Sequence, residues 1–430
     1  MSATKPFAID KWLVYEAYQA VKANAGSAGV DKESIGDFEK DLKGNLYKIW
    51  NRMSSGSYFP PPVKAVAIPK KNGGERILGV PTVADRVAQT VVKRVIEPGM
   101  EAKFLPDSYG YRPGRSALDA VGVTRERCWK YSWVLEFDIK GLFDNIDHAL
   151  LEKALEKHVE CEWAMLYIRR WLTAPLQQAD GTRVERTRGT PQGGVVSPVL
   201  ANLFLHYTFD VWMTKHYPDN PWCRYADDGL VHCRTEQEAQ ALMAALDARF
   251  AQCALQMHPD KTKIVYCKDG SRKGRYPVTQ FDFLGYTFRP RVVKNSKRNS
   301  LFVSFTPAVS NKAITAMRAT TRKLSYRNRT ELSLADISRL HNPVLRGWLA
   351  YYGRFYRSAM YPVFRHFNKT LVAWAMRKYR RLKGHKIRAS RFLEQLSEKQ
   401  PYLFVHWQKG MVGAFACWER CESRGSRTVL

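Results

Sequence analysis

Residues 133–139 read Trp-Val-Leu-Glu-Phe-Asp-Ile, an apolar run that ends on an acid and leads into Gly141-Leu142-Phe143-Asp144. A short apolar run of this kind is typical of a buried strand, and we expect a helix to follow it. Asp138 has two interpretations. It caps the following helix, as aspartate readily does, or it presents a carboxylate at the end of the strand.

A second acidic strand end lies at Arg224-Tyr225-Ala226-Asp227-Asp228-Gly229-Leu230-Val231. This pattern predicts a tight turn with two adjacent carboxylates, but an Asp-Asp-Gly turn is common without any catalytic role. If the strands of Asp138 and Asp227 are neighbours in one sheet, their carboxylates converge on a shared pair of Mg²⁺ ions. Such a pair activates a 3′-hydroxyl and steadies leaving pyrophosphate, so nucleotide polymerisation is our leading hypothesis.

The rest of the chain predicts an α+β protein of several parts. Residues 1–56 favour helices, and residues 60–81 favour a basic hairpin around Asn72-Gly73-Gly74. Between residues 130 and 290, strands alternate with helices, which indicates a sheet domain. We expect strands at 133–139, 229–233, 263–267 and 281–288, and helices at 149–158 and 237–250. Strand signals end near residue 305, and apolar positions at helical spacing then predict a helical bundle over residues 337–376.

The chain is strongly basic, with 69 Lys and Arg against 40 Asp and Glu and a formal net charge of +29. A polyanionic partner explains an excess that otherwise costs self-repulsion. Residues 311–390 hold 19 of the cations and two acids, so +17 of the +29 lies there. The alternative is a solvated surface over a core that includes Trp348, Tyr352 and Tyr356. The arginines that exceed what solubility requires are Arg346, Arg354, Arg357, Arg365, Arg377, Arg380 and Arg381.

The eight cysteines form no Cys-x-x-Cys pair, which argues against a disulfide framework or a zinc ribbon and favours a reducing compartment. No stretch approaches the roughly 18 consecutive apolar residues of a membrane-spanning helix, and the N-terminus has no signal-peptide core. We therefore expect a cytoplasmic protein without a membrane partner.

Ordered blocks along the chain closely resemble the reverse transcriptases encoded by bacterial group II introns. These blocks are Ile68-Pro69-Lys70-Lys71-Asn72-Gly73-Gly74, residues 137–146, Gly189-Thr190-Pro191-Gln192-Gly193-Gly194, Tyr225-Ala226-Asp227-Asp228, His258-Pro259-Asp260-Lys261-Thr262-Lys263 and Phe283-Leu284-Gly285-Tyr286. Arg346-Gly347-Trp348-Leu349-Ala350-Tyr351-Tyr352 looks like the family's maturase, or X, domain. The resemblance covers nearly the whole chain. It implies a right-hand polymerase with fingers, a palm with an antiparallel sheet, and a helical thumb.

The resemblance also implies a division of the chain. We expect an N-terminal extension and fingers at 1–90, a palm interleaved with further fingers segments at 91–303, a helical thumb and X domain at 304–400, and a C-terminal segment at 401–430. Many family members carry a C-terminal His-Asn-His nuclease with paired Cys-x-x-Cys ligands. Cys417 and Cys421 are too few ligands for that module. We therefore expect the compact form, without an endonuclease domain.

By resemblance, Asp138, Asp227 and Asp228 are the catalytic carboxylates that bind two Mg²⁺ ions, for which Mn²⁺ is a possible substitute. The Ile139 carbonyl is implied as a further ligand.

The residues implied at the incoming dNTP are Lys70, Arg76, Phe143 and Gln192. Lys70 and Arg76 would stabilise the triphosphate, although an edge hairpin also carries charges to avoid aggregation. Phe143 would exclude a 2′-hydroxyl, or it is a core residue. Gln192 would lie near the nucleotide, or it is a turn residue.

Contacts with nucleic acid are implied at three places. Tyr109, Arg112 and Arg115 would lie along the template. Lys261 and Lys263 would touch primer or template phosphate, although lysines near a strand start are usually only solvated. In the basic bundle the implied contacts are Arg346, Arg354, Arg357, Arg377 and Arg380.

The resemblance implies an RNA-directed DNA polymerase of a group II intron. Its partners would be structured intron RNA, an RNA template with a DNA primer, and dNTPs, and it would assist splicing and retromobility. One alternative is a host-adapted relative that acts in DNA repair or defence. Another is an RNA-binding splicing cofactor without polymerase activity, against which the intact set of three aspartates speaks.

Overall fold

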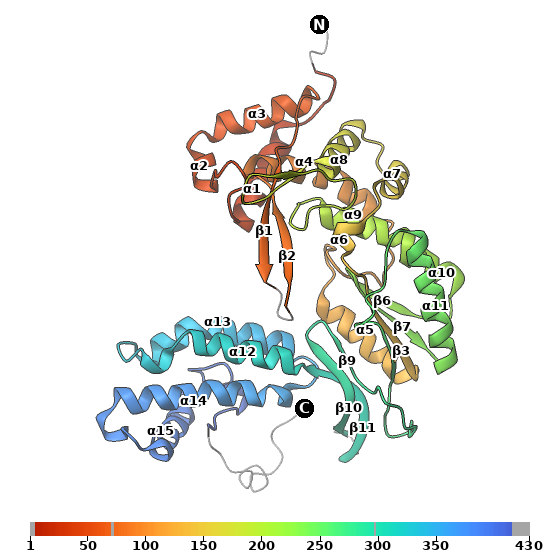
Figure 1. Ribbon diagram of the computed structural model, residues 1–430. Helices are drawn as coiled ribbons and strands as arrows, with labels where there is room; N and C mark the ends of the chain where they lie inside the picture. The colour runs from red at the N-terminus through yellow and green to blue at the C-terminus, as the bar shows by residue number, and fades with distance from the viewer. Residues whose placement is uncertain (1–4, 70–72, 296–297, 415–430) are drawn as a thin grey trace. The chain divides into compact units, whose positions relative to one another are not determined.

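The computed structural model describes residues 5–69, 73–295 and 298–414, and Figure 1 shows its helices and strands. The chain divides into two compact units. The first unit comprises Met1–Ala120 and Leu135–Lys263, and the second comprises Val121–Val134 and Ile264–Leu430. Helices and strands are mixed along the chain, so the predicted α+β class is confirmed.

Four helices form the N-terminal part of the first unit. They are α1 (Lys11–Asn24), α2 (Ile35–Lys40), α3 (Leu42–Ser54) and, further along the chain, α4 (Val83–Glu101). Each begins after a short polar residue whose side chain accepts a hydrogen bond from the first turn, namely Asp10, Ser34, Asp41 and Thr82. Helix α1 packs on α3 and α4. The prediction of helices before residue 56 is confirmed.

The predicted basic hairpin is also present. Strands β1 (Val63–Pro69) and β2 (Glu75–Val80) pair antiparallel, with Ile68 opposite Arg76, and they extend away from the helices α1–α4 (Figure 1). Two short strands, β4 (Leu176–Gln177) and β5 (Arg183–Val184), complete a sheet of order β2-β1-β4-β5. Residues 70–72 at the turn, and with them Lys70, lie outside the described residues.

The sheet that carries the acidic strand ends has the order β6-β7-β3-β8. Its strands are β6 (Trp222–Tyr225), β7 (Asp228–Cys233), β3 (Trp133–Asp138) and β8 (Lys263–Tyr266). An added Cβ on Gly229 of β7 would lie 2.1 Å from the ring of Phe137 on β3, so only glycine fits at this crossing. The strands of Asp138 and Asp227 are therefore neighbours in one sheet, which is the condition that the metal-site hypothesis required.

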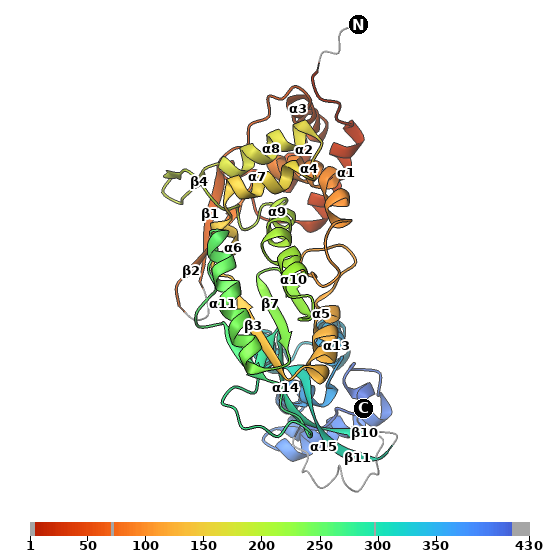
Figure 2. The ribbon, with the colours of Figure 1, turned by 90° about the vertical axis from the view of Figure 1, so that its right-hand side faces the viewer.

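Helices cover this sheet through an aromatic cluster. The ring of Phe137 lies 5.1 Å from that of Phe209 and 5.6 Å from that of Phe250. Figure 2 shows the helix of Phe250, α11 (Glu236–Gln252), alongside β3 and β7. Phe209 lies in a π-helical turn, His206–Asp210, between α9 (Ser197–Leu205) and α10 (Val211–His216). The other helices in this part of the chain are α5 (Ala117–Lys130), α6 (Leu142–Asn145), α7 (His148–Glu156) and α8 (Glu162–Thr173).

The second unit contains a small sheet and the predicted helical bundle. The sheet has the order β11-β10-β9, with β9 (Phe281–Phe283), β10 (Tyr286–Asn295) and β11 (Ser300–Val309). The bundle helices are α12 (Asn311–Lys323), α13 (Leu334–Tyr352), α14 (Tyr361–Lys378) and α15 (Lys386–Lys399). Trp348 and Tyr352 pack against the core of the bundle from half-buried positions.

Two expectations about strands were wrong in this unit. The single strand expected at 281–288 is two strands, because Leu284 and Gly285 have left-handed backbones (φ 50° and 80°) and form a turn. Strand signals do not end near residue 305, because β11 continues to Val309. Its residues Leu301, Phe302 and Val303 are exposed, so β11 lacks the alternation by which a half-buried strand is recognised.

Two histidines are buried among the aromatic rings of the bundle. His341 stacks on Phe367 at 4.5 Å, and its ring nitrogens have no hydrogen-bond partner among the described residues. His406 bonds to Asn368 Oδ1 through Nε2 at 2.7 Å. Burial lowers the pKa of His341 to about 4 and that of His406 to about 3, from an ordinary 6.5.

We expect the second unit to lose stability as the pH falls below 6.5. Below this pH the two histidines are protonated in the unfolded chain but stay neutral in the folded one. The free energy of unfolding therefore falls by up to about 1.4 kcal/mol per pH unit for each histidine until pH 4. Pulse proteolysis in urea, with fragments of residues 311–414 identified, measures this decline. His341→Phe should remove about half of it. The same change at the exposed His385 should remove none, and an equal effect of both would contradict the assignment.

Candidate active site

The turn between β6 and β7 presents Asp227 and Asp228. Tyr225 lies opposite Asp228 across the two strands, which leaves Ala226 and Asp227 as the turn residues. Ala226 has a left-handed backbone (φ 56°), which a residue with a Cβ adopts only at a cost. An added Cβ on Gly110 would lie 2.4 Å from the Ala226 nitrogen, so glycine leaves room for the turn.

A buried arginine, Arg224, is hydrogen-bonded to the backbone of the acidic turn. The side chain of Arg224 is fully buried, and its Nη1 donates to the Ala226 carbonyl at 3.2 Å. Its Nε and Nη2 donate to the two carboxylate oxygens of Asp210 at 2.7 and 2.6 Å, and Asp210 is also fully buried. Asn202 and Ser108 accept the remaining hydrogen bonds. The guanidinium therefore links the π-helical turn that carries Asp210 to the acidic turn.

Asp138 ends β3 beside this turn. Its side chain is 9% exposed, and the next backbone N–H, that of Ile139, donates to the Asp227 carbonyl at 3.3 Å. The Asp138 carbonyl accepts from the His258 N–H at 2.7 Å, which brings residues 258–261 to the site. Lys261 then donates from Nζ to the Asp138 carboxylate. Asp138, Asp227 and Lys261 thus meet at one place.

The carboxylates at this place repel one another. Burial, followed by the charge of Asp138, raises the pKa of Asp227. Burial and the charges of Asp227 and Asp138 raise the pKa of Asp228 to about 7. Burial opposes the charge of Lys261, but its bond to Asp138 and the nearby carboxylates leave its pKa raised. An excess of negative charge that already attracts one ammonium group favours cations.

The donor set fits Mg²⁺ that arrives with its substrate. Within residues 5–69, 73–295 and 298–414, no three His, Cys, Asp or Glu side chains are gathered as a ready-made metal site. Mg²⁺ in phosphoryl-transfer enzymes is usually bound by one or two carboxylates together with water and substrate phosphates. Asp138 and Asp227 supply such carboxylates. The ammonium group of Lys261 pairs with the Asp138 carboxylate, so this carboxylate already binds a positive charge. The Ile139 carbonyl stays a predicted ligand.

Two of the residues expected at the nucleotide are linked to each other. Arg76 on β2 donates from Nε to the Gln192 side chain, whose Nε2 donates to Asp144 Oδ2 at 3.1 Å. The Gly79 N–H donates to the Gln192 carbonyl at 2.9 Å. Gln192 is therefore fastened to the basic hairpin through both its side chain and its backbone.

Phe143 lies behind a tyrosine that was not predicted. Phe143 is 8% exposed, and its ring meets that of Tyr111 edge-on at 6.3 Å. Burial and the charge of Asp227 raise the pKa of Tyr111, and the preceding residue, Gly110, packs against the Ala226 backbone. Tyr111 has a left-handed backbone (φ 57°), a signal that the sequence does not carry.

The segment that carries Gln192 is held by a buried polar chain that sequence reasoning also missed. Gln89 on α4 accepts from the Val195 N–H at 2.6 Å and donates to Asp85 at 2.9 Å. Asp85 in turn accepts from Tyr58 and Trp171 at 2.9 and 2.7 Å. The sequence signal was only a pair of polar residues four apart, which lie on the buried face of α4, a helix that was not predicted.

The expected nucleic-acid contacts of the first unit have different surroundings. Arg112 does not face solvent: its side chain is 3% exposed, pairs with Glu101 at 2.6 Å and donates to backbone carbonyls, so it shapes its own loop and is corrected here to a structural residue. Arg115 is exposed and lies over the Tyr109 ring. Lys263 pairs with Glu136 at 3.1 Å.

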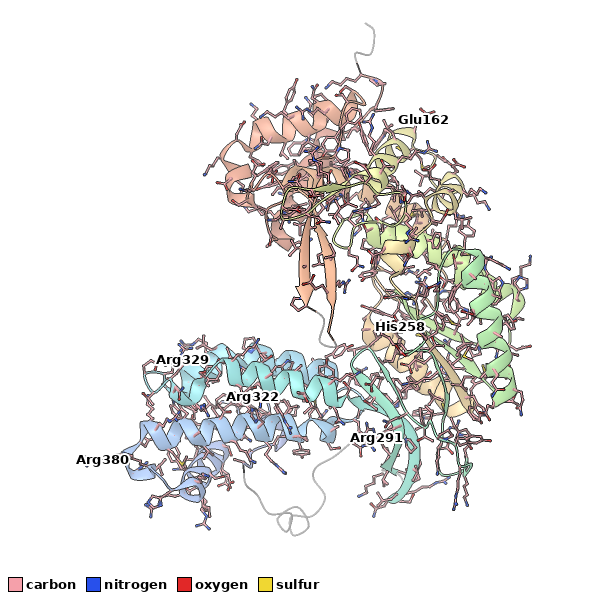
Figure 3. All side chains as sticks on the ribbon, in the orientation of Figure 1. Glu162, His258, Arg291, Arg322, Arg329 and Arg380 are labelled. Atoms are coloured by element: carbon pink, nitrogen blue, oxygen red, sulfur yellow. The ribbon has the colours of Figure 1, made fainter. Side chains whose placement is uncertain are left out.

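The expected contacts of the basic bundle are at its surface. The arginines named from the sequence, Arg346, Arg354, Arg357, Arg377 and Arg380, are all exposed. Further exposed cations accompany them, among them Arg322 and Arg329 (Figure 3). Cys417 and Cys421 lie outside the described residues. None of the helices in the described part of the chain combines the length and apolar character of a membrane span.

Comparison with known proteins gives two family matches. Residues 68–288, more than half of the chain, match the model of the reverse transcriptase (RNA-dependent DNA polymerase) family. Residues 314–392 match the group II intron maturase-specific domain. These matches confirm the predicted resemblance and the predicted right-hand polymerase class.

Individual relatives cover different shares of the chain. Protein YkfC of Escherichia coli (strain K12) is 30% identical over 305 residues, which are 60% of this chain and 78% of that protein. The group II intron-encoded protein LtrA of Lactococcus lactis subsp. cremoris is 34% identical over 198 residues, 45% of this chain, and the match spans only 32% of LtrA. A solved telomerase from Candida albicans, in complex with a fragment of telomeric RNA, aligns with a TM-score of 0.45 at 13% identity over 88% of this chain and 68% of that chain.

Proposed function

Because the chain belongs to the reverse transcriptase (RNA-dependent DNA polymerase) family, we propose that it adds dNTPs to a primer 3′-hydroxyl on an RNA template with two Mg²⁺ ions. The observation that carries this proposal is the meeting of Asp138 with the Asp227–Asp228 turn at neighbouring strand ends. The test is extension of oligo(dT) on poly(rA) with dTTP. Elongation with Mg²⁺ that stops when the metal is chelated is expected, and no elongation would contradict the proposal.

In this reaction the primer 3′-oxygen attacks the α-phosphorus of the dNTP, and pyrophosphate leaves. Asp138, Asp227 and Asp228 would hold the ions, and bound Mg²⁺ would promote loss of the 3′-hydroxyl proton and offset charge on the phosphates. Lys261 would exchange its bond to Asp138 for a phosphate oxygen. Arg76, with Lys70, would bind the triphosphate, and Gln192 would orient the nucleotide beside it.

We propose that residues 1–90 act as an N-terminal extension and fingers, and that residues 91–303 act as a palm interleaved with further fingers segments. Residues 304–400 would act as thumb and maturase domain. The maturase-specific match and the exposed arginines of the bundle support RNA binding there. On this basis the chain assists the splicing of its intron RNA. Co-expression with the transcript that flanks its reading frame tests this, since both RNA excision and cDNA are expected.

Phe143→Ala should relax the selection of deoxynucleotides. A ring behind the sugar position rejects a 2′-hydroxyl sterically, a discrimination of about 10- to 200-fold for one small group. The ratio of dTTP to UTP incorporation on poly(rA) should fall by such a factor. Phe59→Ala, at a 70% exposed ring of the same unit, is the control. Equal ratios in all three proteins would make Phe143 a core residue only.

Neutralising the bundle arginines should flatten the salt dependence of RNA binding. The slope of log affinity against log salt is negative, and each lost phosphate contact makes it less steep by about 0.7 to 0.9. We expect a decrease of up to about 3 when Arg354, Arg357, Arg377 and Arg380 are changed to Gln. The matched control changes four exposed cations of the first unit, Lys153, Lys157, Arg183 and Lys215. A larger effect of the control set would move the RNA contact to the first unit.

A further inference from the structure

A groove of about 1420 Å³ lies within the second unit, and none of its lining residues belongs to the acidic site. Its walls are the last two turns of α5, the β10–β11 hairpin, the loop at 269–271, and the segments 355–358 and 408–410. The hairpin that forms one wall also carries Arg291 (Figure 3). None of these residues belongs to the motifs from which the polymerase site was predicted.

The groove exposes ring and aliphatic surfaces that a core would bury. Trp129 is 44% exposed, Phe302 is 49% exposed and Leu301 is 71% exposed. Trp129 is held in place, because its Nε1 donates to the Phe305 carbonyl at 3.0 Å. The guanidinium of Arg125 lies 4.5 Å from the Trp129 ring centre. An exposed ring that is held in place beside an arginine offers a stacking platform, which marks a binding surface.

The charge of the lining is positive. Its cations are Arg125, Lys294, Arg357 and Lys409, and its acid is Asp269. Asp269 is already neutralised by Arg272, whose Nε donates to it at 2.8 Å. Neutral donors and acceptors also line the groove, namely Ser271, Asn299, Ser304, Thr306, Tyr356, Ser358 and Gln408. The complementary ligand is therefore anionic, carries flat apolar faces and has further hydrogen-bonding groups.

We propose that this groove binds a single-stranded RNA segment. Bases would stack on Trp129 and Phe302, and phosphates would lie near Lys294 and Lys409. Stacking on aromatic rings along a cationic groove is how proteins bind single strands, whereas a duplex hides the faces of its bases. The hydroxyl and amide side chains of the lining suit a 2′-hydroxyl. The choice of RNA rests on the proposed function, which supplies RNA as the partner.

The test is photocrosslinking of the full chain to an unstructured RNA of about 12 nucleotides that contains 4-thiouridine. We expect crosslinks to peptides that contain Trp129 or Phe302. The double change Phe302→Ser with Lys294→Gln should lower their yield at least about fivefold. The matched control is Tyr402→Ser with Lys399→Gln, two exposed residues of the same unit outside the groove, and it should leave the yield unchanged.

Three results would overturn the proposal: crosslinks only outside the groove, an unchanged yield in the double variant, or equal competition by DNA or by duplex RNA of the same sequence. Extension of oligo(dT) on poly(rA) is measured on the same preparations. If the unaltered chain extends the primer but gives no crosslinks to the groove peptides, the groove proposal alone would be refuted. Retained crosslinks without extension in the unaltered chain would refute the proposed polymerase and leave the groove standing.

Discussion

Asp227→Asn should lower the rate of dNTP addition at least about a thousandfold, because a carboxylate that helps to hold catalytic metal contributes several kcal/mol to the barrier. The fold should survive, since the change removes one of the charges that raise the pKa of Asp228. Single-turnover primer extension on poly(rA) measures the rate. Melting curves should show equal or higher stability than the unaltered chain.

The control for this experiment is Asp219→Asn, an exposed aspartate of the same unit. It should leave the rate unchanged. If Asp227→Asn kept more than about a tenth of the rate, the carboxylate would not be a metal ligand, and the assignment of Asp138 beside it would fall too.

Asp210→Ala should destabilise the first unit by about 3 to 5 kcal/mol, because it leaves the fully buried guanidinium of Arg224 without its counter-charge. Urea unfolding followed by proteolysis of residues 135–263 measures the loss. Asp247→Ala, at an exposed acid of α11, should change the stability by no more than about 0.5 kcal/mol.

A double variant separates stability from positioning. Replacing both Arg224 and Asp210 by Leu removes the whole buried ion pair, which is often nearly neutral for stability. We expect the double variant to add a single dideoxynucleotide more slowly than the unaltered chain, because the Ala226 carbonyl has lost its hydrogen-bond donor. Recovery of both stability and rate would show that Arg224 does not position the acidic turn.

Sequence patterns predicted β3, β7 and β8 of the active-site sheet because these strands are short, apolar and bounded by turn residues, whereas β6 was not predicted. The acidic turn at Asp227 and the strand end at Asp138 follow from local pattern alone. That the two strands are neighbours required the sheet order, which local pattern does not contain. The long strand β11 escaped because its exposed face is apolar, which removes the period of two.

The supporting contacts could not be predicted, because they join residues far apart in the chain. Gln89 reaches Val195 and Arg224 reaches Asp210 through geometry that depends on a complete fold. The same limit explains Arg112. The family resemblance implies that Arg112 lies along the template, but only the fold shows that Glu101 and nearby carbonyls already use its donors.

Gly229 has a consequence for anyone who redesigns this polymerase. Its missing side chain lets the Phe137 ring occupy the crossing of β7 and β3. When residue 229 is varied at random, only clones that keep glycine should be active. Variation at this position therefore cannot be used to tune copying speed or accuracy. Tyr111 has an exposed side chain, so a substitution there meets less steric resistance than one at the strand crossing.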